Sequence, residues 1–373
     1  MAATDYSQRV PARLTVAHLR RYAIARSLFA PTAIPDAVQR LGFVQADPIR
    51  APARAQDLTL RHRVAGYRAG DLERLYPTLA IEEDAFINYG FLPRAHYALM
   101  HPRSPRKRWG PAATRRAMAV LEFVRDKGEA HPRDVDAHFA HGAIQNYWGG
   151  SSNLTTHVLD GLHYRGLLRV TRRDNGIRVY AALEPPPAPI DAAARRERVD
   201  SLVDIVIRKY APLPLASLNA VARRLRYGVP QWRSGIESAL VRARKRLAHT
   251  HVDGVDWYWP ADEEPRTIGA RAPERVRLLA PFDPIVWDRA RFEMFWNWAY
   301  RFEAYTPPRL RKLGYYALPL LWRDQVIGWA NLTAAGGVLQ STFGYVAGRP
   351  PRDSAFARQL EREIVDIRAF LRL

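Results

Sequence analysis

The chain has 373 residues, enough for two to four ordinary domains, and 47% of them are hydrophobic, which excludes an intrinsically disordered protein. No apolar run approaches the roughly 18 residues of a membrane helix, and the first residues lack the apolar core of a signal peptide, so we expect a cytoplasmic protein that does not enter a membrane. The chain contains no cysteine, which excludes disulfides, thiol nucleophiles and cysteine-based zinc sites.

The charge balance favours a polyanionic partner. Lysine and arginine total 57 against 37 aspartate and glutamate, a net charge of +20, and only five of the 57 are lysines. Arginine is the residue that binds phosphate oxygens bidentately, so nucleic acid is the simplest partner. A GC-rich genome would also explain arginine in place of lysine, but it would not explain the excess positive charge.

The first hundred residues predict two helices and an apolar strand. Thr15 is a suitable N-cap for a helix over 16–26, and Pro35 opens a short helix that Gly42 ends. The strand that follows lies in the stretch "LGFVQADPI". We interpret residues 1–105 as a diverged winged-helix unit.

A clearer winged-helix order appears over 106–185. One helix ends at Gly128, a second begins at Pro132, a third begins near Ser151–Ser152, and two strands meet at an Asn175-Gly176 turn. Three helices followed by a hairpin are the order of a winged helix, whose third helix usually enters the major groove of DNA.

The same order returns over 190–262, after a proline-rich linker at 184–191. A helix precedes a second one that starts near Pro214, and two strands flank an Asp253-Gly254 turn. The helix before those strands carries an apolar side formed by Ile236, Leu240, Val241 and Leu247.

Residues 263–373 predict a small β domain with a closing helix. The segments expected to contain its strands are "RLLAPFDPIVWD", "YRFEAY", "GYYALPLLW", "QVIGWANLTA" and "GVLQSTFGYV". The closing helix has an apolar stripe at Phe356, Leu360, Ile364, Ile367 and Leu371. The expected fold class is therefore mainly α with β: tandem winged-helix units, a small C-terminal β domain and a final helix.

The motifs of common cofactor and metal enzymes are absent from the sequence. There is no GxxxxGK[ST] loop, no HExxH and no GxSxG elbow, so we expect neither a cofactor nor a metal. Any chemistry must then come from carboxylates, amides and bound water.

The stretch "FVQADP" is the best candidate for such chemistry. In a strand Gln45 and Asp47 share one face, about 7 Å apart at Cα, and Pro48 holds the backbone of Asp47 extended. A carboxylate fixed in this way, with arginines close by, suits the activation of water. A purely structural Asx-Pro turn explains the same residues and stays open as the alternative.

Three stretches carry a family resemblance that extends over nearly the whole chain. They are "LGFVQADPI", "ARAQDLTLRHRVAGYRAGDLERLY" and the long "LLAPFDPIVWDRARFEMFWNWAYRFEAYTPPRLRKLGYYALPLLWRDQVIGWANL". Together they resemble the YcaQ/AlkZ-like bacterial DNA glycosylases, a family also described as winged-helix DNA-binding proteins.

The resemblance implies hydrolysis of the N-glycosidic bond of N7-alkylated guanine, with interstrand crosslinks as further substrates. In this scheme Asp47 activates water and Gln45 holds the water or the deoxyribose. No lysine is near the motif in sequence, so a monofunctional glycosylase is expected. The implied partner is double-stranded DNA with alkylation damage, bound by a monomer.

A set of basic residues is expected to face DNA, with solvated surface charges as the alternative. They are Arg50, Arg54, Arg61, His62, Arg172, Arg173 and Arg301. For Arg301 we also consider a structural pair with Glu303 in the β domain.

The chain departs from the family pattern at two places. Gln56-Asp57 follows Arg54-Ala55 where a histidine is usual, and the segment around Glu83–Tyr89 contains none of the expected histidines. We expect these positions to shape the lesion pocket. A non-catalytic winged-helix regulator is the competing function, and only Gln45, Asp47 and the family resemblance argue against it.

Overall fold

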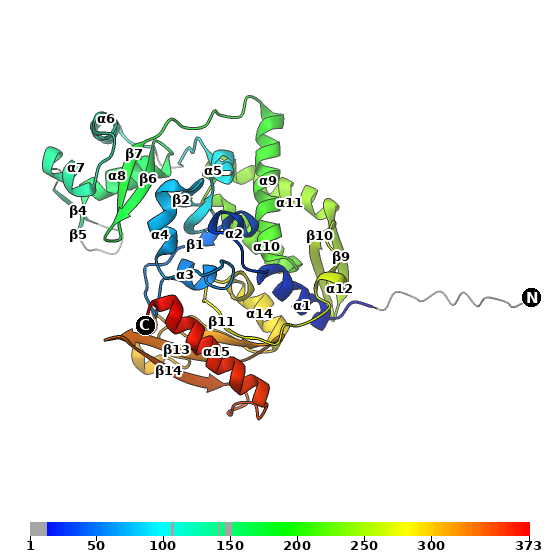
Figure 1. Cartoon of the computed structure of the whole chain (residues 1–373). Helices are drawn as coiled ribbons and strands as arrows, with labels where there is room; N and C mark the ends of the chain where they lie inside the picture. Colours follow the sequence, from blue (N-terminus) through cyan, green and yellow to red (C-terminus); the bar gives the residue numbers. More distant parts are fainter. Residues whose placement is uncertain (1–12, 106–107, 141, 146–150) are drawn as a thin grey trace, which may run out of the picture.

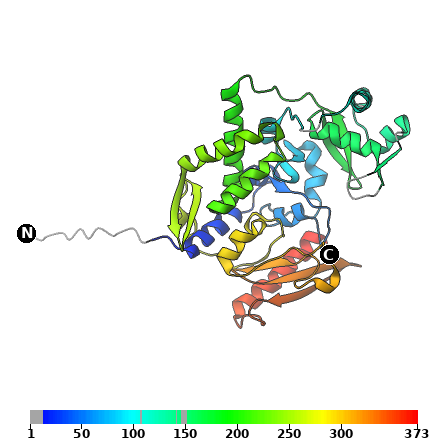
Figure 2. The ribbon, with the colours of Figure 1, turned by 180° about the vertical axis from the view of Figure 1, so that it is seen from behind.

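The computed structural model describes residues 13–105, 108–140, 142–145 and 151–373. Its elements form four groups in chain order, coloured from blue to red in Figure 1. The group from the first hundred residues lies in the middle of the other three (Figures 1 and 2). This placement lets the candidate strand contact several parts of the chain.

The central group holds short helices around a three-stranded antiparallel sheet of order β1-β3-β2. Thr15 caps the first helix in a capping box, and Gly42 ends the second in a left-handed conformation (φ 68°), both as predicted. The elements are α1 (Val16–Ser27), α2 (Ile34–Leu41), β1 (Val44–Gln45), α3 (Ala55–Leu60), α4 (Asp71–Leu75), η1 (Tyr76–Thr78), β2 (Ile81–Ala85), β3 (Tyr89–Pro93) and α5 (Arg94–Met100).

The second group has the expected order of three helices and a hairpin. Asn175 and Gly176 both have positive φ at the hairpin turn, as an Asn-Gly turn requires. The third helix begins at Leu154 under an Asn153 cap, because residues 151–153 form a strand instead. The elements are α6 (Pro111–Lys127), α7 (Pro132–Phe139), β4 (Ala143–Gln145), β5 (Ser151–Asn153), α8 (Leu154–Tyr164), β6 (Leu168–Asp174) and β7 (Ile177–Ala182).

The third group repeats this order, with one correction. Val241 is 54% exposed and Leu247 begins a strand, so neither belongs to the buried side of the third helix, which Ile236, Ala239, Leu240 and Ala243 form. The elements are α9 (Ala192–Tyr210), β8 (Leu213–Pro214), α10 (Leu215–Arg223), η2 (Arg224–Arg226), η3 (Pro230–Trp232), α11 (Arg233–Arg246), β9 (Leu247–Val252) and β10 (Val255–Pro260).

The last group is a four-stranded antiparallel sheet with a closing helix, but it contains more helix than predicted. Residues 284–296 are mostly helical, since Asp283 and Asp288 cap two short helices there, and "YRFEAY" contains no strand. The elements are α12 (Pro265–Ile268), β11 (Val276–Leu278), α13 (Pro284–Trp287), α14 (Arg289–Trp296), η4 (Pro308–Leu310), β12 (Leu318–Trp322), β13 (Gln325–Ala335), β14 (Val338–Tyr345) and α15 (Ser354–Leu371).

The two largest of the four hydrophobic cores of the described residues each join several groups. One contains buried side chains from the central group, the second group and the C-terminal sheet, and the other joins the central group to the third. The fold is thus mainly α with small sheets, as predicted. The winged-helix assignment and the boundaries at 105, 185–190 and 262 stay interpretations that the element order fits.

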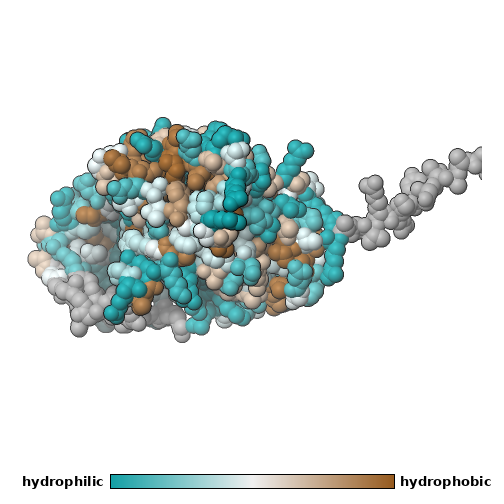
Figure 3. All heavy atoms as spheres, turned by 90° about the horizontal axis from the view of Figure 1, so that it is seen from below, coloured by the Kyte–Doolittle hydropathy of each residue, from teal (hydrophilic) through white to brown (hydrophobic). Residues whose placement is uncertain are grey.

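The side of the molecule on which the C-terminal group lies carries both hydrophilic and hydrophobic residues (Figure 3). Figure 3 shows this side, where hydrophobic residues gather in patches among polar ones. Exposed and half-exposed residues predominate along β14. Among the described residues, no helix combines the length and the apolar character that crossing a membrane requires.

Candidate active site

A cleft of about 1000 Å³ lies where the central, second and C-terminal groups meet. The end of β1 supplies Gln45 and Asp47, and the β6–β7 hairpin supplies Arg173 and Ile177. The segment that follows β11 supplies an aromatic wall, made of Phe282, Phe302 and Tyr305. The cleft therefore collects residues that lie up to 260 positions apart in the chain.

Gln45 is nearly buried and held by one specific contact. It pairs with Gly90 across the small sheet, so its backbone position is fixed by β3. The indole N–H of Trp287 donates to Gln45 Oε1 at 2.9 Å. With the carbonyl end occupied, the amide NH₂ of Gln45 is the end left for the cleft.

Asp47 follows the strand and combines both interpretations of its motif. Its Oδ1 accepts the backbone N–H of Ile49 at 2.9 Å, which is the Asx turn of the structural alternative. Its side chain nevertheless lines the cleft, and no hydrogen bond from a described residue reaches Oδ2. The turn therefore orients the carboxylate without consuming it.

The charge of Asp47 has no cationic partner among the ion pairs of the described residues. Burial raises the pKa of Asp47 above its ordinary value, and the Ile49 hydrogen bond offsets this only in part. A carboxylate with a raised pKa is a stronger base, which suits proton abstraction from water.

The nearby arginines are engaged with other acids. Arg54 forms an ion pair with Glu73, and Arg173 binds Glu83 and donates to the Gly176 carbonyl at 2.7 Å. Both line the cleft, whereas Arg50 is exposed beside it. Partial burial and the charges of Arg50 and Arg173 lower the pKa of Arg54, so three arginines interact at this edge of the cleft, two of them paired with acids.

Comparisons with known proteins give the family and the fold of the chain. The family model described as "DNA glycosylase AlkZ-like" matches residues 38–370. The chain belongs to the AlkZ-like DNA glycosylase family. The solved structure of the Streptomyces sahachiroi DNA glycosylase AlkZ is similar over 96% of this chain and 97% of that one, with a TM-score of 0.62 and 14% identity, and so it shares the fold.

Arg61 and His62 of this chain were expected to face DNA, but their side chains lie inside the protein. Arg61 pairs with Glu363 of α15 and donates to the Leu278 carbonyl at 3.0 Å, with its side chain 4% exposed. His62 contacts the same carbonyl at 3.0 Å, and burial lowers its pKa well below the ordinary value. The expectation was wrong for both, because these side chains fasten α15 and β11 to the central group.

The remaining two predicted contacts, Arg172 and Arg301, lie on the surface and do not line the cleft. Arg172 is exposed and pairs with Glu129 at 3.2 Å. Arg301 is exposed and makes no ion pair with a described residue. Glu303 accepts the backbone N–H groups of Lys312, Leu313 and Gly314, and no ion pair within 4 Å joins it to Arg301. Against the effect of burial, these hydrogen bonds and the more distant charge of Arg301 lower the pKa of Glu303.

The departures from the family pattern have two different environments. Gln56 lines the cleft, and its Oε1 accepts the backbone N–H of Asp47 at 3.3 Å. Asp57 turns away and accepts from the Tyr67 hydroxyl at 2.7 Å and the Gly70 N–H at 3.1 Å. Of the segment Glu83–Tyr89, only Asn88 and Tyr89 line the cleft.

Sequence reasoning missed a lysine that the fold brings to the motif. Lys209 of α9 is buried and donates to the Phe43 carbonyl, two residues before Gln45. Burial lowers the pKa of Lys209 to about 7. It does not line the cleft, so its contact is with the strand backbone and not with the space beside Asp47.

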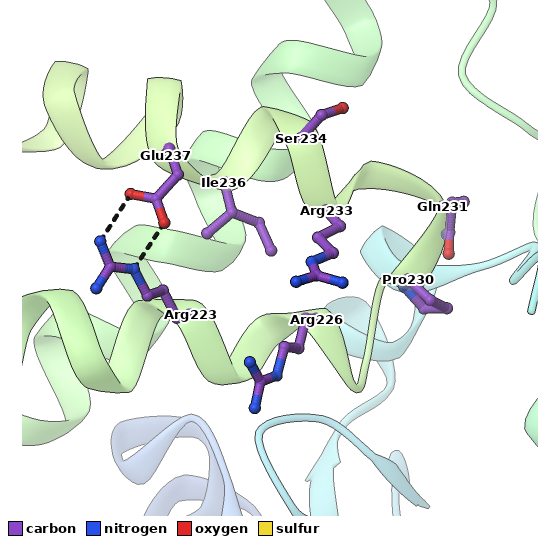
Figure 4. Close-up of a pocket in the computed structure, with 8 residues that line it drawn as sticks. All are labelled: Arg223, Arg226, Pro230, Gln231, Arg233, Ser234, Ile236 and Glu237. Carbon is purple, nitrogen blue, oxygen red and sulfur yellow. Dashed lines mark hydrogen bonds and ion pairs between the residues drawn. The ribbon is translucent and has the colours of Figure 1, made fainter. Parts of the chain in front are cut away.

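A second hollow, of about 590 Å³, lies between α10, η3 and α11 and is lined by Arg223, Arg226 and Arg233 (Figure 4). Its acid, Glu237, is paired with Arg223 at 2.7 Å. This hollow offers a basic surface but no free carboxylate. No group of three or more potential metal ligands occurs among the described residues.

Proposed function

We propose that the protein hydrolyses the N-glycosidic bond of N7-alkylated guanine in double-stranded DNA, with Asp47 as the base that activates water. The observation that carries the proposal is the uncompensated carboxylate of Asp47 in a large cleft. A carboxylate that is half-buried and paired only with a backbone N–H is costly to keep charged unless a cation arrives with the substrate.

Alkylation at N7 supplies that cation. The positively charged base departs with the electrons of the C1′–N9 bond and becomes neutral, so it needs no acid. Positive charge then develops on the sugar, which Asp47 stabilises electrostatically. Asp47 takes one proton from the attacking water as the water oxygen bonds to C1′.

Gln45 is proposed to hold the water or the sugar. Trp287 occupies its carbonyl oxygen, so the NH₂ group is left to donate to an oxygen in the cleft. These two roles require both side chains at the same strand end, and the pairing of Gln45 with Gly90 of β3, two residues before Asp47, supports this.

The size of the cleft favours bulky lesions, including interstrand crosslinks. A crosslinked base is tied to the opposite strand and cannot enter a snug pocket. A cleft of about 1000 Å³, lined by the β6–β7 hairpin and the aromatic wall, leaves room for such a base. Arg50, Arg54 and Arg173 are proposed to hold the flanking phosphates.

A monofunctional monomer fits the same residues. Lys209 does not line the cleft, so no described lysine is placed to attack C1′. All the proposed groups belong to one chain. A transcription regulator would need no uncompensated carboxylate there, and no specific observation favours that alternative.

The test uses Asp47→Asn on a duplex that carries one N7-methylguanine, with alkali-sensitive abasic sites as the readout. We expect excision to fall about 10²- to 10⁴-fold, the usual cost of losing a general base. DNA affinity and the melting temperature should stay unchanged, because asparagine can still accept the Ile49 N–H. Asp36→Asn, an exposed acid on α2, is the matched control.

Normal excision by Asp47→Asn would remove the mechanism. A wild-type protein that binds the duplex but forms no abasic sites would favour the regulator. A parallel duplex with a nitrogen-mustard crosslink, run on a denaturing gel, asks whether the two strands separate after treatment.

A further inference from the structure

Tyr305 stands out among the aromatic residues of the cleft. The residue is 79% exposed, although it lines the cleft that contains Asp47. Phe302 and Phe282, the other members of the aromatic wall, are only partly exposed. An aromatic ring so exposed in a binding cleft costs hydration free energy unless a ligand covers it.

The ring is supported from behind by other rings. Phe302 meets Tyr305 edge-on with centroids 6.1 Å apart, and it meets Phe282 and Tyr316 in the same way at 5.2 and 5.3 Å. Tyr316 is 2% exposed, so this stack is anchored in the core. Tyr305 thus contacts this buried cluster through Phe302, while most of its own surface stays exposed in the cleft.

The loop that carries Tyr305 is also held firmly. Glu303 is 5% exposed, and its Oε2 accepts the backbone N–H groups of Lys312 at 2.8 Å and Leu313 at 2.7 Å. The Thr306 N–H donates to the Glu303 carbonyl at 2.9 Å. Tyr305 is thus placed on a pinned turn between two fixed residues.

The ring of Tyr305 is left without a cation in a chain rich in arginine. Other exposed tyrosines are covered: Arg226 lies 5.0 Å from the Tyr227 ring and Arg311 lies 5.0 Å from the Tyr315 ring. No lysine or arginine of the described chain lies over the Tyr305 ring, and its hydroxyl makes no hydrogen bond there. The free π-face therefore remains available to a cation from outside.

We propose that Tyr305 is the platform on which the cationic base stacks, and that it selects positively charged bases over neutral ones. The inference rests on the proposed glycosylase function and adds the residue that recognises the base. An aromatic face attracts a cation through its quadrupole, and a planar base adds stacking area. Tyr305 would hold the base while Asp47 faces the sugar.

Tyr305 and Asp47 line the same cleft, and the charge of Asp47 acts on Tyr305. Partial burial, followed by the charge of Asp47, raises the pKa of the Tyr305 hydroxyl. Burial, followed by the charge of the same carboxylate, also raises the pKa of the buried Tyr316. A cationic base on Tyr305 would therefore also be attracted by Asp47, and the two contacts would act on one ligand.

The test measures binding without cleavage. Two duplexes are compared, one with N7-methylguanine on a 2′-fluorinated sugar, which resists glycosidic cleavage, and one with unmodified guanine. For Tyr305→Ala we expect about tenfold weaker binding of the lesion duplex and unchanged binding of the unmodified one. Tyr305→Phe should bind like the wild type, because the π-face is kept.

Tyr315→Ala is the matched control, since Tyr315 is exposed nearby but does not line the cleft. Equal losses on both duplexes, or no loss on either, would overturn the platform. Equal wild-type affinity for both duplexes would overturn it as well. Excision by the wild type is measured separately. If the wild type excises the lesion and Tyr305→Ala binds the lesion duplex as tightly as the wild type does, only the role of Tyr305 is contradicted. If the wild type binds the lesion duplex more tightly than the unmodified one but does not excise the base, only the catalytic proposal is contradicted.

Discussion

Asp84 and Asp47 belong to one small sheet but have opposite surroundings. Asp84 of β2 faces Gly90 of β3, and Gly90 faces Gln45 of β1, two residues before Asp47. Asp84 is 1% exposed. It accepts hydrogen bonds from both terminal nitrogens of Arg103, each at 3.1 Å, and from His101 Nε2 at 2.7 Å. Asp47 has a backbone N–H and open space.

The difference shows what separates a structural acid from a candidate catalytic one in this fold. Burial pushes the pKa of both acids upward, but Arg103 and His101 reverse this effect at Asp84 and hold its pKa far below the ordinary value. At Asp47 burial dominates. One charge is neutralised inside the protein, and the other is left for the substrate.

The largest effect that we expect from replacing either of these two acids is a loss of stability on replacing Asp84. Asp84→Asn leaves the buried Arg103 without its counter-charge, so the free energy of unfolding should fall by about 3–5 kcal/mol. Urea denaturation measures this loss. Asp47→Asn, measured in parallel, should not lose stability, because it removes a half-buried charge that has no partner. Equal losses in the two variants would contradict the comparison.

The pH dependence should separate the two acids in the wild type. Asp47 must be deprotonated to accept a proton, so excision should fall as pH drops through its raised pKa, above the 3.9 or so of a free aspartate. Asp84 has a lowered pKa in the folded state, so its stabilisation is complete above about pH 3.9 and is lost only below it.

In weak acid there should therefore be a range of pH in which the protein is still folded but its excision rate has fallen. Single-turnover excision rates and circular dichroism on the same samples would show it. Excision and folded structure that are lost together, at one midpoint, would show that Asp47 does not set the acid limb.

Local patterns in the sequence predicted the elements well where neighbouring residues decide the outcome. The Thr15 cap, the Gly42 stop and the Asn175-Gly176 turn are such cases. The Gln45–Asp47 spacing also placed two cleft residues together. The helix over 284–287 was missed because "RLLAPFDPIVWD" was expected to contain a strand, and residues 289–296 were assigned no element, whereas the capping acids Asp283 and Asp288 decide the local structure.

Long-range contacts were beyond a reading of local pattern. Arg61 looks like an exposed cation in sequence, and only the packing of α15 shows that Glu363 covers it. Lys209 approaches Phe43 from 166 positions away, and Trp287 reaches Gln45 from 242 positions away. Tyr305 could not be identified from the sequence for the same reason, because its position beside Asp47 depends on the contact between the central and C-terminal groups.

The smallest effect on excision is expected from a substitution of Trp287, which tests the role of Gln45 directly. Trp287→Phe keeps a ring against Tyr210, whose centroid lies 5.0 Å from the indole, but removes the N–H that holds Gln45 Oε1. Such a hydrogen bond contributes about 0.5–1.5 kcal/mol, so excision should slow about two- to tenfold. In a Gln45→Ala background the same substitution should have no further effect, since the two residues act through one contact. Single-turnover rates of the four proteins complete the cycle, and additive losses would show that Trp287 supports the site by another route, through the packing of α13 against the strand end.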